Sequence, residues 1–230
     1  MTMQIKFIVL YNSDGEKRVI EFRQKSVNII TGASKTGKSS ILDIIDYCLG
    51  NNTFEIAAGT IDEAVAWYGV VYVLNDVEIM VAKPRPPGGS TYQSEAYYEI
   101  APEITLPELD ALHPNSNDDA IKDAIGKRLG ISPNLNIPPR GQTRRPLAAN
   151  LSHTKYYLFQ PQSVIANKKV LFYHQSEPFI PQTIKDTIIY FLGVVQEERL
   201  RLKNELDAKR REMRRHRQEL EELESYSVER

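Results

Sequence analysis

Residues 32–39 read GASKTGKS, and no other segment constrains the fold of this chain as strongly. The octapeptide fits the pattern GxxxxGK[ST], in which a glycine-rich loop joins a strand to the start of a helix. Residues 27–31 (VNIIT) form a short β-branched run that is typical of a buried strand. After the loop, apolar residues recur at helical spacing until Gly50, which is placed to cap the helix. We therefore expect a strand, the loop and a helix in this order.

This order of elements predicts a phosphate site. The backbone N–H groups of such a loop and the N-terminus of the following helix attract an anion. Lys38 is placed to reach the β- and γ-phosphates of a nucleotide, Ser39 to ligate Mg²⁺, and Ser40 to hydrogen-bond a phosphate. The alternative is a glycine-bearing turn that contains lysine by chance. We expect the whole loop to hold the phosphates: Gly32, Ala33, Ser34, Lys35, Thr36, Gly37, Lys38, Ser39 and Ser40.

Composition narrows the class of protein. A chain of 230 residues suits one domain with a substantial core, or one domain with an extension. The net charge of −1 favours no class of partner, and Cys48, the only cysteine, excludes an internal disulfide and fits a reducing compartment. The N-terminus does not resemble a signal peptide, and no window is apolar enough to span a membrane. We expect a soluble, cytoplasmic protein without a membrane partner.

The remaining elements are predicted from turn residues and periodicity. Strands are expected at residues 4–11, 18–22, 66–74, 77–82 and 92–100, with hairpin turns at residues 12–15 and 75–76. Helices are expected at residues 118–129, stopped by Gly130, at residues 148–157, and from Pro181 onward. Between them, the proline-rich and arginine-rich residues 131–146 are expected to form a surface loop. We assign residues 1–194 to one α/β domain with an antiparallel β region.

The C-terminal residues 195–230 have a different character. A 4/3 spacing runs through Val195, Arg199, Leu202, Leu206, Lys209, Met213, His216, Leu220 and Leu223, among mostly charged residues. This spacing predicts the start of a coiled-coil arm with polar breaks at Arg199, Lys209 and His216. The alternative is a solvated single helix held by i,i+4 pairs. Because the pattern still runs at the last residue, we expect the partner strand to lie outside this chain.

Several motifs of a complete hydrolytic site are not found in the sequence. No run of four apolar residues ends convincingly in an acidic residue that could hold Mg²⁺ and orient water; residues 72–76 come closest but form the expected hairpin turn. An LSGG-like signature and the guanine-specifying NKxD pattern are also missing, and residues 123–126 match DxxG only within a helical stretch. The sequence therefore indicates a nucleotide-binding half without the hydrolytic half.

Together, the early phosphate loop, the N-terminal hairpin, the late glutamine segment and the charged C-terminal helix resemble the SMC-like (RecN-type) branch of the ABC ATPases. In that branch a coiled coil separates an N-terminal lobe from a C-terminal lobe that carries the signature, the magnesium-binding Asp and the catalytic Glu. The text TGASKTGKS, then DYCLG, FQPQ, AN and VLFY resembles more closely an uncharacterised bacterial SMC-like family associated with anti-phage systems of the Lamassu or ABC-three-component type. The implied fold is the N-terminal lobe of a P-loop NTPase head.

The resemblance also implies site residues. It makes Gln162, or alternatively Gln160, the glutamine-loop residue that contacts Mg²⁺ and the attacking water, with Lys38 as the catalytic lysine. In such heads the N-terminal hairpin, which here carries Lys17, Arg18 and Arg23, often approaches the nucleotide, although a solvated strand edge is an equal reading. The basic residues around the proline-rich loop are possible contacts for DNA phosphates: Lys127, Arg128, Arg140, Arg144 and Arg145.

The function implied by the resemblance is that of an ATPase that dimerises on ATP and acts on or senses DNA, in prokaryotic genome maintenance or anti-phage defence. ATP and Mg²⁺ are the implied cofactors; the implied partners are a C-terminal lobe, a second head, DNA and defence-system subunits. This chain alone is expected to bind ATP without hydrolysing it. The alternatives are a small-molecule P-loop kinase with an oligomerising helix, and a coiled-coil scaffold that binds nucleotide only for stability.

Overall fold

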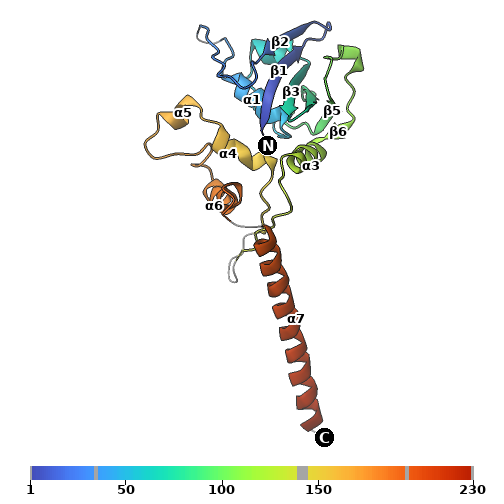
Figure 1. Ribbon diagram of the computed structural model, residues 1–230, viewed down its shortest axis with the longest axis vertical. Coiled ribbons are helices and arrows are strands. Elements are labelled where there is room, and N and C mark those ends of the chain that lie inside the picture. Colours follow the sequence, from blue (N-terminus) through green and yellow to red (C-terminus); the bar gives the residue numbers. More distant parts are fainter. Residues whose placement is uncertain (1, 34–35, 139–144, 195–196, 229–230) are drawn as a thin grey trace. The chain divides into compact units, whose positions relative to one another are not determined.

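The computed structural model describes residues 2–33, 36–138, 145–194 and 197–228. The described residues form a mixed α/β fold around an antiparallel sheet of six strands in the order β2-β1-β3-β4-β5-β6 (Figure 1). The strands are β1 (Met3–Tyr11), β2 (Lys17–Glu21), β3 (Trp67–Leu74), β4 (Val77–Pro84), β5 (Glu95–Ala101) and β6 (Ser116–Asn117). The helices are α1 (Ser40–Cys48), α2 (Thr60–Ala64), α3 (Asp118–Arg128), α4 (Lys155–Leu158), α5 (Gln162–Ile165), α6 (Ile180–Phe191) and α7 (Glu197–Val228).

The chain divides into two compact units. The first contains Met1–Ile131 and Asn150–Ser176, and the second contains Ser132–Ala149 and Glu177–Arg230. The first unit holds the sheet, α1 to α5 and the glycine-rich loop, whereas the second holds α6 and α7. The candidate site described below therefore lies within the first unit alone.

Two tight hairpins form where the turn residues predict them. Asn12 closes the β1–β2 turn by accepting hydrogen bonds from the backbone N–H groups of Asp14 and Glu16 through its side chain, and Gly15 has φ +86°. Between β3 and β4, Leu74 pairs with Val77 across a two-residue turn in which Asn75 has φ +55°. Asparagine tolerates this left-handed conformation better than other non-glycine residues. Both hairpins confirm the prediction from sequence.

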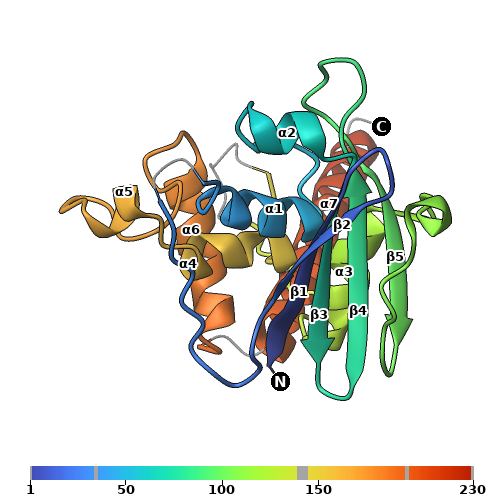
Figure 2. The same ribbon diagram turned by 90° about the horizontal axis from the view of Figure 1, so that it is seen from above.

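Both faces of the central strands are buried. Neighbouring residues of a strand point to opposite faces, and Ile8, Val70 and Val81 accordingly belong to one core while Val9 and Val71 belong to the other. The first core is shared with α1 and α3, which pack on the same face of the sheet (Figure 2). The second core is closed by the segment between β5 and β6, where Tyr11 donates a hydrogen bond to the carbonyl of Pro107 over 3.1 Å.

The expected strand at residues 27–31 is not formed, and this prediction was wrong. The segment has no regular secondary structure and pairs with none of the described strands; Val27 is 85% exposed, Ile29 82% and Ile30 42%. A strand needs a neighbour for its N–H and C=O groups. The strands that precede it pair with each other, β3 takes the other side of β1, and the run does not add to the outer edge of β2.

Two other elements begin later than predicted because side chains compete for backbone N–H groups. Asn150 accepts a hydrogen bond from the N–H of Ser152, so a short 3₁₀ helix starts at Leu151 and leads into α4. Gln93 accepts a hydrogen bond from the N–H of Glu95 and delays β5 to that residue. Such local side-chain contacts are a known rival to regular structure.

The second unit contains two helices and the segment that precedes Asn150. Asn134 binds the backbone of Ala149 in both directions, at 2.9 Å through its amide nitrogen and at 2.6 Å through its oxygen. The N–H of Ser132 donates to the hydroxyl of Tyr190 on α6 over 2.9 Å, which ties this segment to the helix. α6 begins with Pro181 in its first turn, as predicted. α7 is one continuous helix of 32 residues.

In the described part of the chain, no helix is both long and apolar enough to cross a membrane.

We expect replacement of two glycines by alanine to have opposite effects on the free energy of unfolding. A Cβ at Gly69 on β3 would lie 2.7 Å from Cγ1 of Val9, whereas a Cβ at Gly126 inside α3 would meet Ile131 only at 3.9 Å. We expect Gly69→Ala to destabilise the protein by about 1–3 kcal/mol through overpacking. Gly126→Ala should stabilise it by about 0.5–1 kcal/mol through helix propensity. Urea unfolding of both variants checks this, and equal effects in the two variants would contradict the packing described for the sheet.

Candidate functional site

The glycine-rich loop passes directly into the first turn of α1. Gly32, Ala33 and the run from Thr36 to Ser40 are described, while Ser34 and Lys35 lie outside the described residues. Gly37 has φ +81°, and a Cβ there would lie 2.3 Å from Cδ1 of Ile61 on α2. Glycine suits this position because of its backbone conformation, and a Cβ here would also displace the end of the Ile61 side chain.

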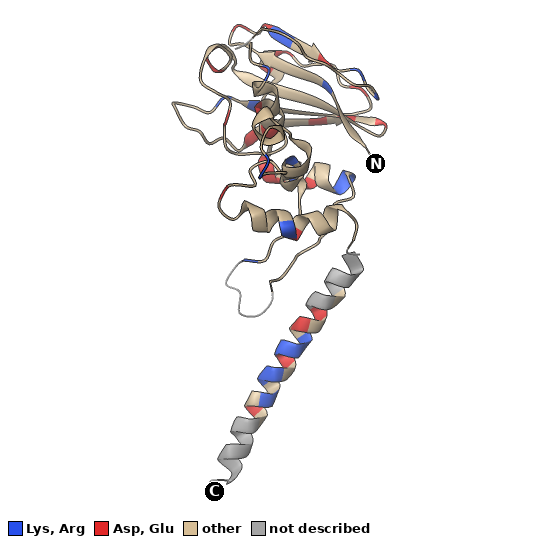
Figure 3. Cartoon of the chain, turned by 90° about the vertical axis from the view of Figure 1, so that its left-hand side faces the viewer, with Lys and Arg blue, Asp and Glu red and all other residues tan. Residues whose placement is uncertain are grey.

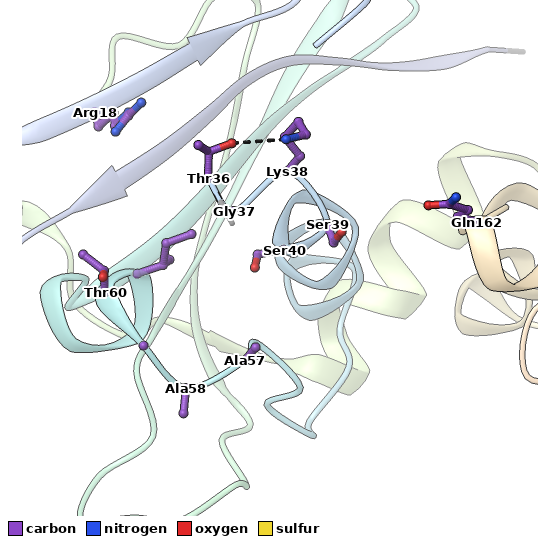
Figure 4. A pocket seen from close by; sticks show the side chains of 12 residues that line it. Arg18, Thr36, Gly37, Lys38, Ser39, Ser40, Ala57, Ala58, Thr60 and Gln162 are labelled. Carbon is purple, nitrogen blue, oxygen red and sulfur yellow. Dashed lines mark hydrogen bonds between the residues drawn. The ribbon is translucent and has the colours of Figure 1, made fainter. Parts of the chain in front are cut away.

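Lys38 folds back over the loop. Its ammonium group donates to the carbonyl oxygens of Gly32, over 2.9 Å, and Ala33, and lies 3.3 Å from the hydroxyl of Thr36 (Figure 4). The hydroxyl of Thr36 in turn donates to the carbonyl of Ala33 over 2.9 Å. The lysine thus sits among acceptors at the centre of the loop, where an incoming anion could exchange with these carbonyl groups.

A pocket of about 980 Å³ opens next to the loop. Ser39, which precedes α1 and makes no capping hydrogen bond with its side chain, lines it together with the buried Ser40. The volume is within the range typical of small-molecule sites. The residues that line the pocket are Arg18, Thr36, Gly37, Lys38, Ser39, Ser40, Ala57, Ala58, Gly59, Thr60, Ile61 and Gln162 (Figure 4).

The two candidate glutamines have different surroundings. Gln162 is the first residue of α5 and lines the pocket, more than a hundred residues after the loop in sequence. Gln160, two residues earlier, does not line it; its amide nitrogen lies 3.4 Å from the carbonyl of Leu171, to which it donates. Pro161 between them has an extended backbone, so the two side chains are not equivalent.

The three basic residues of the N-terminal hairpin are also separated by the fold. Arg18 lies on β2 opposite Leu10 and lines the pocket. Its neighbour Lys17 points to the other face of the sheet and forms an ion pair with Glu108 at 2.6 Å. Arg23 does not line the pocket. Of these three residues, only Arg18 lines the pocket: strand alternation turns Lys17 to the other face, and Arg23 lies beyond the end of β2.

Ion pairs fix α1 to the elements around it. Asp46, near the end of α1, pairs with Lys155 of α4 at 2.8 Å and accepts a hydrogen bond from Asn51 at 2.8 Å. Both charged side chains are largely buried, and α4 leads within a few residues to Gln162. This ion pair therefore connects the helix that follows the loop to the segment that carries the glutamine.

A second, more deeply buried ion pair lies behind α1. Lys83 of β4 pairs with Asp118 of α3 at 2.6 Å, and its ammonium group also donates to the carbonyl of Asn51 over 2.8 Å and lies 4.2 Å from the ring centre of Tyr47. Burial lowers the pKa of Lys83 and raises that of Asp118, and their mutual hydrogen bond opposes both shifts. Removal of one partner would leave a buried charge without compensation.

The carboxylate of Asp43 in the first turn of α1 has an unusual environment. Burial, together with the nearby acidic groups of Glu55 and Asp46, raises its pKa from 3.8 to about 6. None of the described residues that line the pocket is acidic, and no cluster of three or more His, Cys, Asp or Glu side chains among the described residues could hold a metal ion. The side-chain oxygen donors in the lining are neutral: the hydroxyls of Thr36, Ser39, Ser40 and Thr60 and the amide of Gln162.

One wall of the pocket was not foreseen from the sequence. Residues 57–61 read AAGTI and bring small side chains and the start of α2 to the loop. Gly59 has φ +143°, a conformation that L-residues rarely adopt. A run of small residues that ends in glycine before a short helix was the signal available in the sequence.

Comparison with protein-family models gives no match for this chain, and no curated protein matches it at a significant level.

The raised pKa of Asp43 predicts a destabilising charge near neutral pH. The folded state binds this proton more tightly than the unfolded state, so its contribution to stability is present below about pH 4 and is lost as the pH rises through about 6. Allowing for its partial exposure, we expect Asp43→Asn to stabilise the protein by about 1–2 kcal/mol near pH 7 and to have little effect near pH 4. Urea unfolding at the two pH values measures this.

The exposed carboxylate of Asp123 on α3 provides the control, because its side chain is 78% exposed. Asp123→Asn should change stability by less than about 0.5 kcal/mol at either pH. A loss of stability in Asp43→Asn near pH 7 would show that the carboxylate makes a favourable contact that outweighs its burial.

Proposed function

We propose that this chain is the ATP-binding N-terminal lobe of an SMC-like ABC ATPase head, a P-loop NTPase fold, with α7 as the start of a coiled-coil arm. One observation carries the proposal: the glycine-rich loop, Arg18 of β2 and Gln162 of α5, which are far apart in sequence, line a single pocket. Such convergence of a phosphate-loop motif with separate polar groups is what a nucleotide site requires.

In this proposal the triphosphate lies along the loop. The N–H groups at the start of α1 face the phosphates, and Lys38 exchanges its present carbonyl acceptors for β- and γ-phosphate oxygens. Gly37 allows the backbone to approach the phosphates closely, because glycine has no side chain and tolerates a φ of +81°. Arg18, an exposed cation on the same pocket, supplies a further positive charge.

Ser39 and Gln162 would hold Mg²⁺ from two sides of the pocket. Their side chains are neutral oxygen donors, so in this proposal most of the negative charge around the ion comes from the phosphates. A bound Mg²⁺ would supply positive charge against the phosphate oxygens, and Gln162 would also orient the attacking water. In this proposal the catalytic carboxylate comes from a second lobe, in keeping with a described pocket lining that contains no acidic side chain.

The exposed run at residues 27–30 supports a second lobe. Val27 and Ile29 lie almost fully in solvent immediately before the loop. β-branched residues are costly to leave exposed as a group and favour strand pairing. A C-terminal lobe that supplies a neighbouring strand would bury this run and at the same time bring its catalytic carboxylate to the phosphates.

The proposed roles in DNA binding and anti-phage defence rest on the resemblance to the SMC-like family. Lys127 and Arg128 at the end of α3 and Arg145 are exposed, as a DNA contact requires, whereas Arg140 and Arg144 lie outside the described residues. A head of this kind would engage a second head on binding ATP and separate after hydrolysis, so that ATP acts through its different affinity for two states. Defence-system subunits would then respond to the ATP-bound state.

Lys38→Ala tests the nucleotide site directly. Loss of two charge-assisted hydrogen bonds to phosphate should weaken ATP–Mg²⁺ binding by about 100-fold or more, measured by calorimetry. Lys127→Ala, a change of an exposed lysine on α3, serves as the control and should bind as the parent does. Unchanged affinity in Lys38→Ala would contradict the proposed site.

The two glutamines give a matched pair for the magnesium site. We expect Gln162→Ala to reduce the gain in ATP affinity that Mg²⁺ provides, because its amide would ligate the ion, while Gln160→Ala should leave that gain unchanged. The measurement is ATP affinity with and without Mg²⁺ for each variant. An equal response of both variants would remove Gln162 from the magnesium site.

Turnover distinguishes the complete head from an enzyme contained in this chain. We expect the chain to bind ATP and to hydrolyse it only after addition of a candidate C-terminal lobe that carries the catalytic carboxylate. Phosphate release is measured for each component and for the mixture. Turnover by the chain alone, with a phosphorylated small-molecule product, would favour a P-loop kinase instead.

A further inference from the structure

The short helix that begins at Gln162 has little packing of its own. None of the four residues of α5 is buried, and Ile165 is 71% exposed. The nearest buried side chain before it is that of Phe159, which belongs to the first core of the sheet. The N–H of Phe159 donates to the carbonyl of Lys155 over 3.0 Å, which joins it to α4. The position of Gln162 in the pocket therefore depends on how α4 is attached to the rest of the unit.

The ion pair between Lys155 and Asp46 attaches α4 to α1. Ion pairs on α7, where charges of both signs alternate (Figure 3), lie in solvent, and the side chain of Lys209 there is 80% exposed. The side chains of Lys155 and Asp46 are only 16% and 10% exposed, and Nζ lies 2.8 Å from Oδ2. Asn51 donates to the same carboxylate oxygen over 2.8 Å. Charge-assisted hydrogen bonds are directional, whereas apolar burial is not, so this contact can fix the place of α4 along α1.

The ion pair lies between the two residues that would hold Mg²⁺. Asp46 follows Ser39 by seven residues along α1, and Lys155 precedes Gln162 by seven residues. Ser39 and Gln162 line one pocket from these two separate segments (Figure 4). A shift of α4 along α1 would therefore change the separation between the Ser39 hydroxyl and the Gln162 amide.

We propose that Asp46 and Lys155 are positioning residues that hold Gln162 at the separation from Ser39 that Mg²⁺ coordination needs. This inference rests on the proposed function and assigns a role within the same site. Neither member of the ion pair lines the pocket, so both act through the placement of α4. Metal sites tolerate little displacement of their ligands, and loss of an outer partner typically weakens metal binding about 10-fold to 100-fold.

Distances between spin labels in the nucleotide-free full chain test the positioning directly. One label on Ser163→Cys, next to Gln162, and one on Glu21→Cys, exposed on β2, report where α5 lies relative to the sheet; the buried Cys48 stays unlabelled. We expect Lys155→Met, which keeps an unbranched side chain without the charge, to shift or broaden the distance distribution measured by pulsed electron paramagnetic resonance. Lys155→Arg should keep the parent distribution, because it can still pair with the carboxylate.

A lysine in another ion pair provides the matched control. Lys17 pairs with Glu108 and is 22% exposed, but it does not line the pocket or contact α4, so Lys17→Met should leave the distribution unchanged. Lys155→Met leaves the carboxylate of Asp46 without its cation, and Asp46→Asn/Lys155→Met removes both charges if the single variant does not fold. A parent-like distribution in the charge-free variants would overturn the proposal, whatever nucleotide binding shows.

The magnesium dependence of ATP affinity tests the consequence for the site. We expect Lys155→Met to reduce the gain in ATP affinity that Mg²⁺ provides by about tenfold, and to leave the affinity without Mg²⁺ unchanged. In a chain that already carries Gln162→Ala, Lys155→Met should cause no further loss of this gain, because the residue that it positions is absent. Additive losses, or an equal loss with and without Mg²⁺, would indicate a general structural role and overturn the proposal.

The label distances also distinguish failure of this inference from failure of the proposed function. A parent chain that binds no ATP would contradict the nucleotide site. A distance distribution altered by Lys155→Met and unchanged by Lys17→Met would still support the placement of Gln162 by the ion pair, since that measurement uses no nucleotide.

Discussion

The position of the glycine-rich loop depends on the burial of the last turns of α1 against β3 and β4. Ile44 and Tyr47 enter the first core of the sheet; the thiol of Cys48 contacts the carbonyl of Tyr68, and the hydroxyl of Tyr47 donates to the carbonyl of Pro84. The C-terminal half of this short helix is fixed, whereas the loop before it lies at the surface, where Gly32, Ala33, Thr36 and Ser39 are exposed. In the proposed function, this end of the helix and the loop before it face the phosphates.

Buried ion pairs connect this anchored helix to distant parts of the chain. Asp46 reaches Lys155, and Lys83 reaches Asp118 and the backbone that follows α1. In a low-dielectric setting such pairs cost desolvation energy and are weak sources of stability, but they fix which elements are neighbours. Here they hold the segment that leads to Gln162 beside the helix that follows the loop, which explains how residues so far apart in sequence share one pocket.

Two surfaces of the chain are more apolar than an independent protein would need. One is the run at residues 27–30 before the loop, and the other is the stripe along α7. The first contains the β-branched residues Val27, Ile29 and Ile30 in a segment that pairs with none of the described strands, and the second has the spacing of a helix seam. In the proposed head, a strand of the second lobe would cover the first surface and a helix would cover the second.

The sequence by itself determined the elements that depend on local contacts. The hairpin turns, α3 with its stop at Gly130, the start of α6 at Pro181, and the placement of the glycine-rich loop before α1 all follow from residues close together in the chain. Tertiary structure alone decided that residues 27–31 find no strand to pair with, because pairing depends on which strands flank β1. It likewise brought Arg18, residues 57–61 and Gln162, rather than Gln160, to the pocket, since strand alternation and long-range packing, not sequence spacing, set those positions.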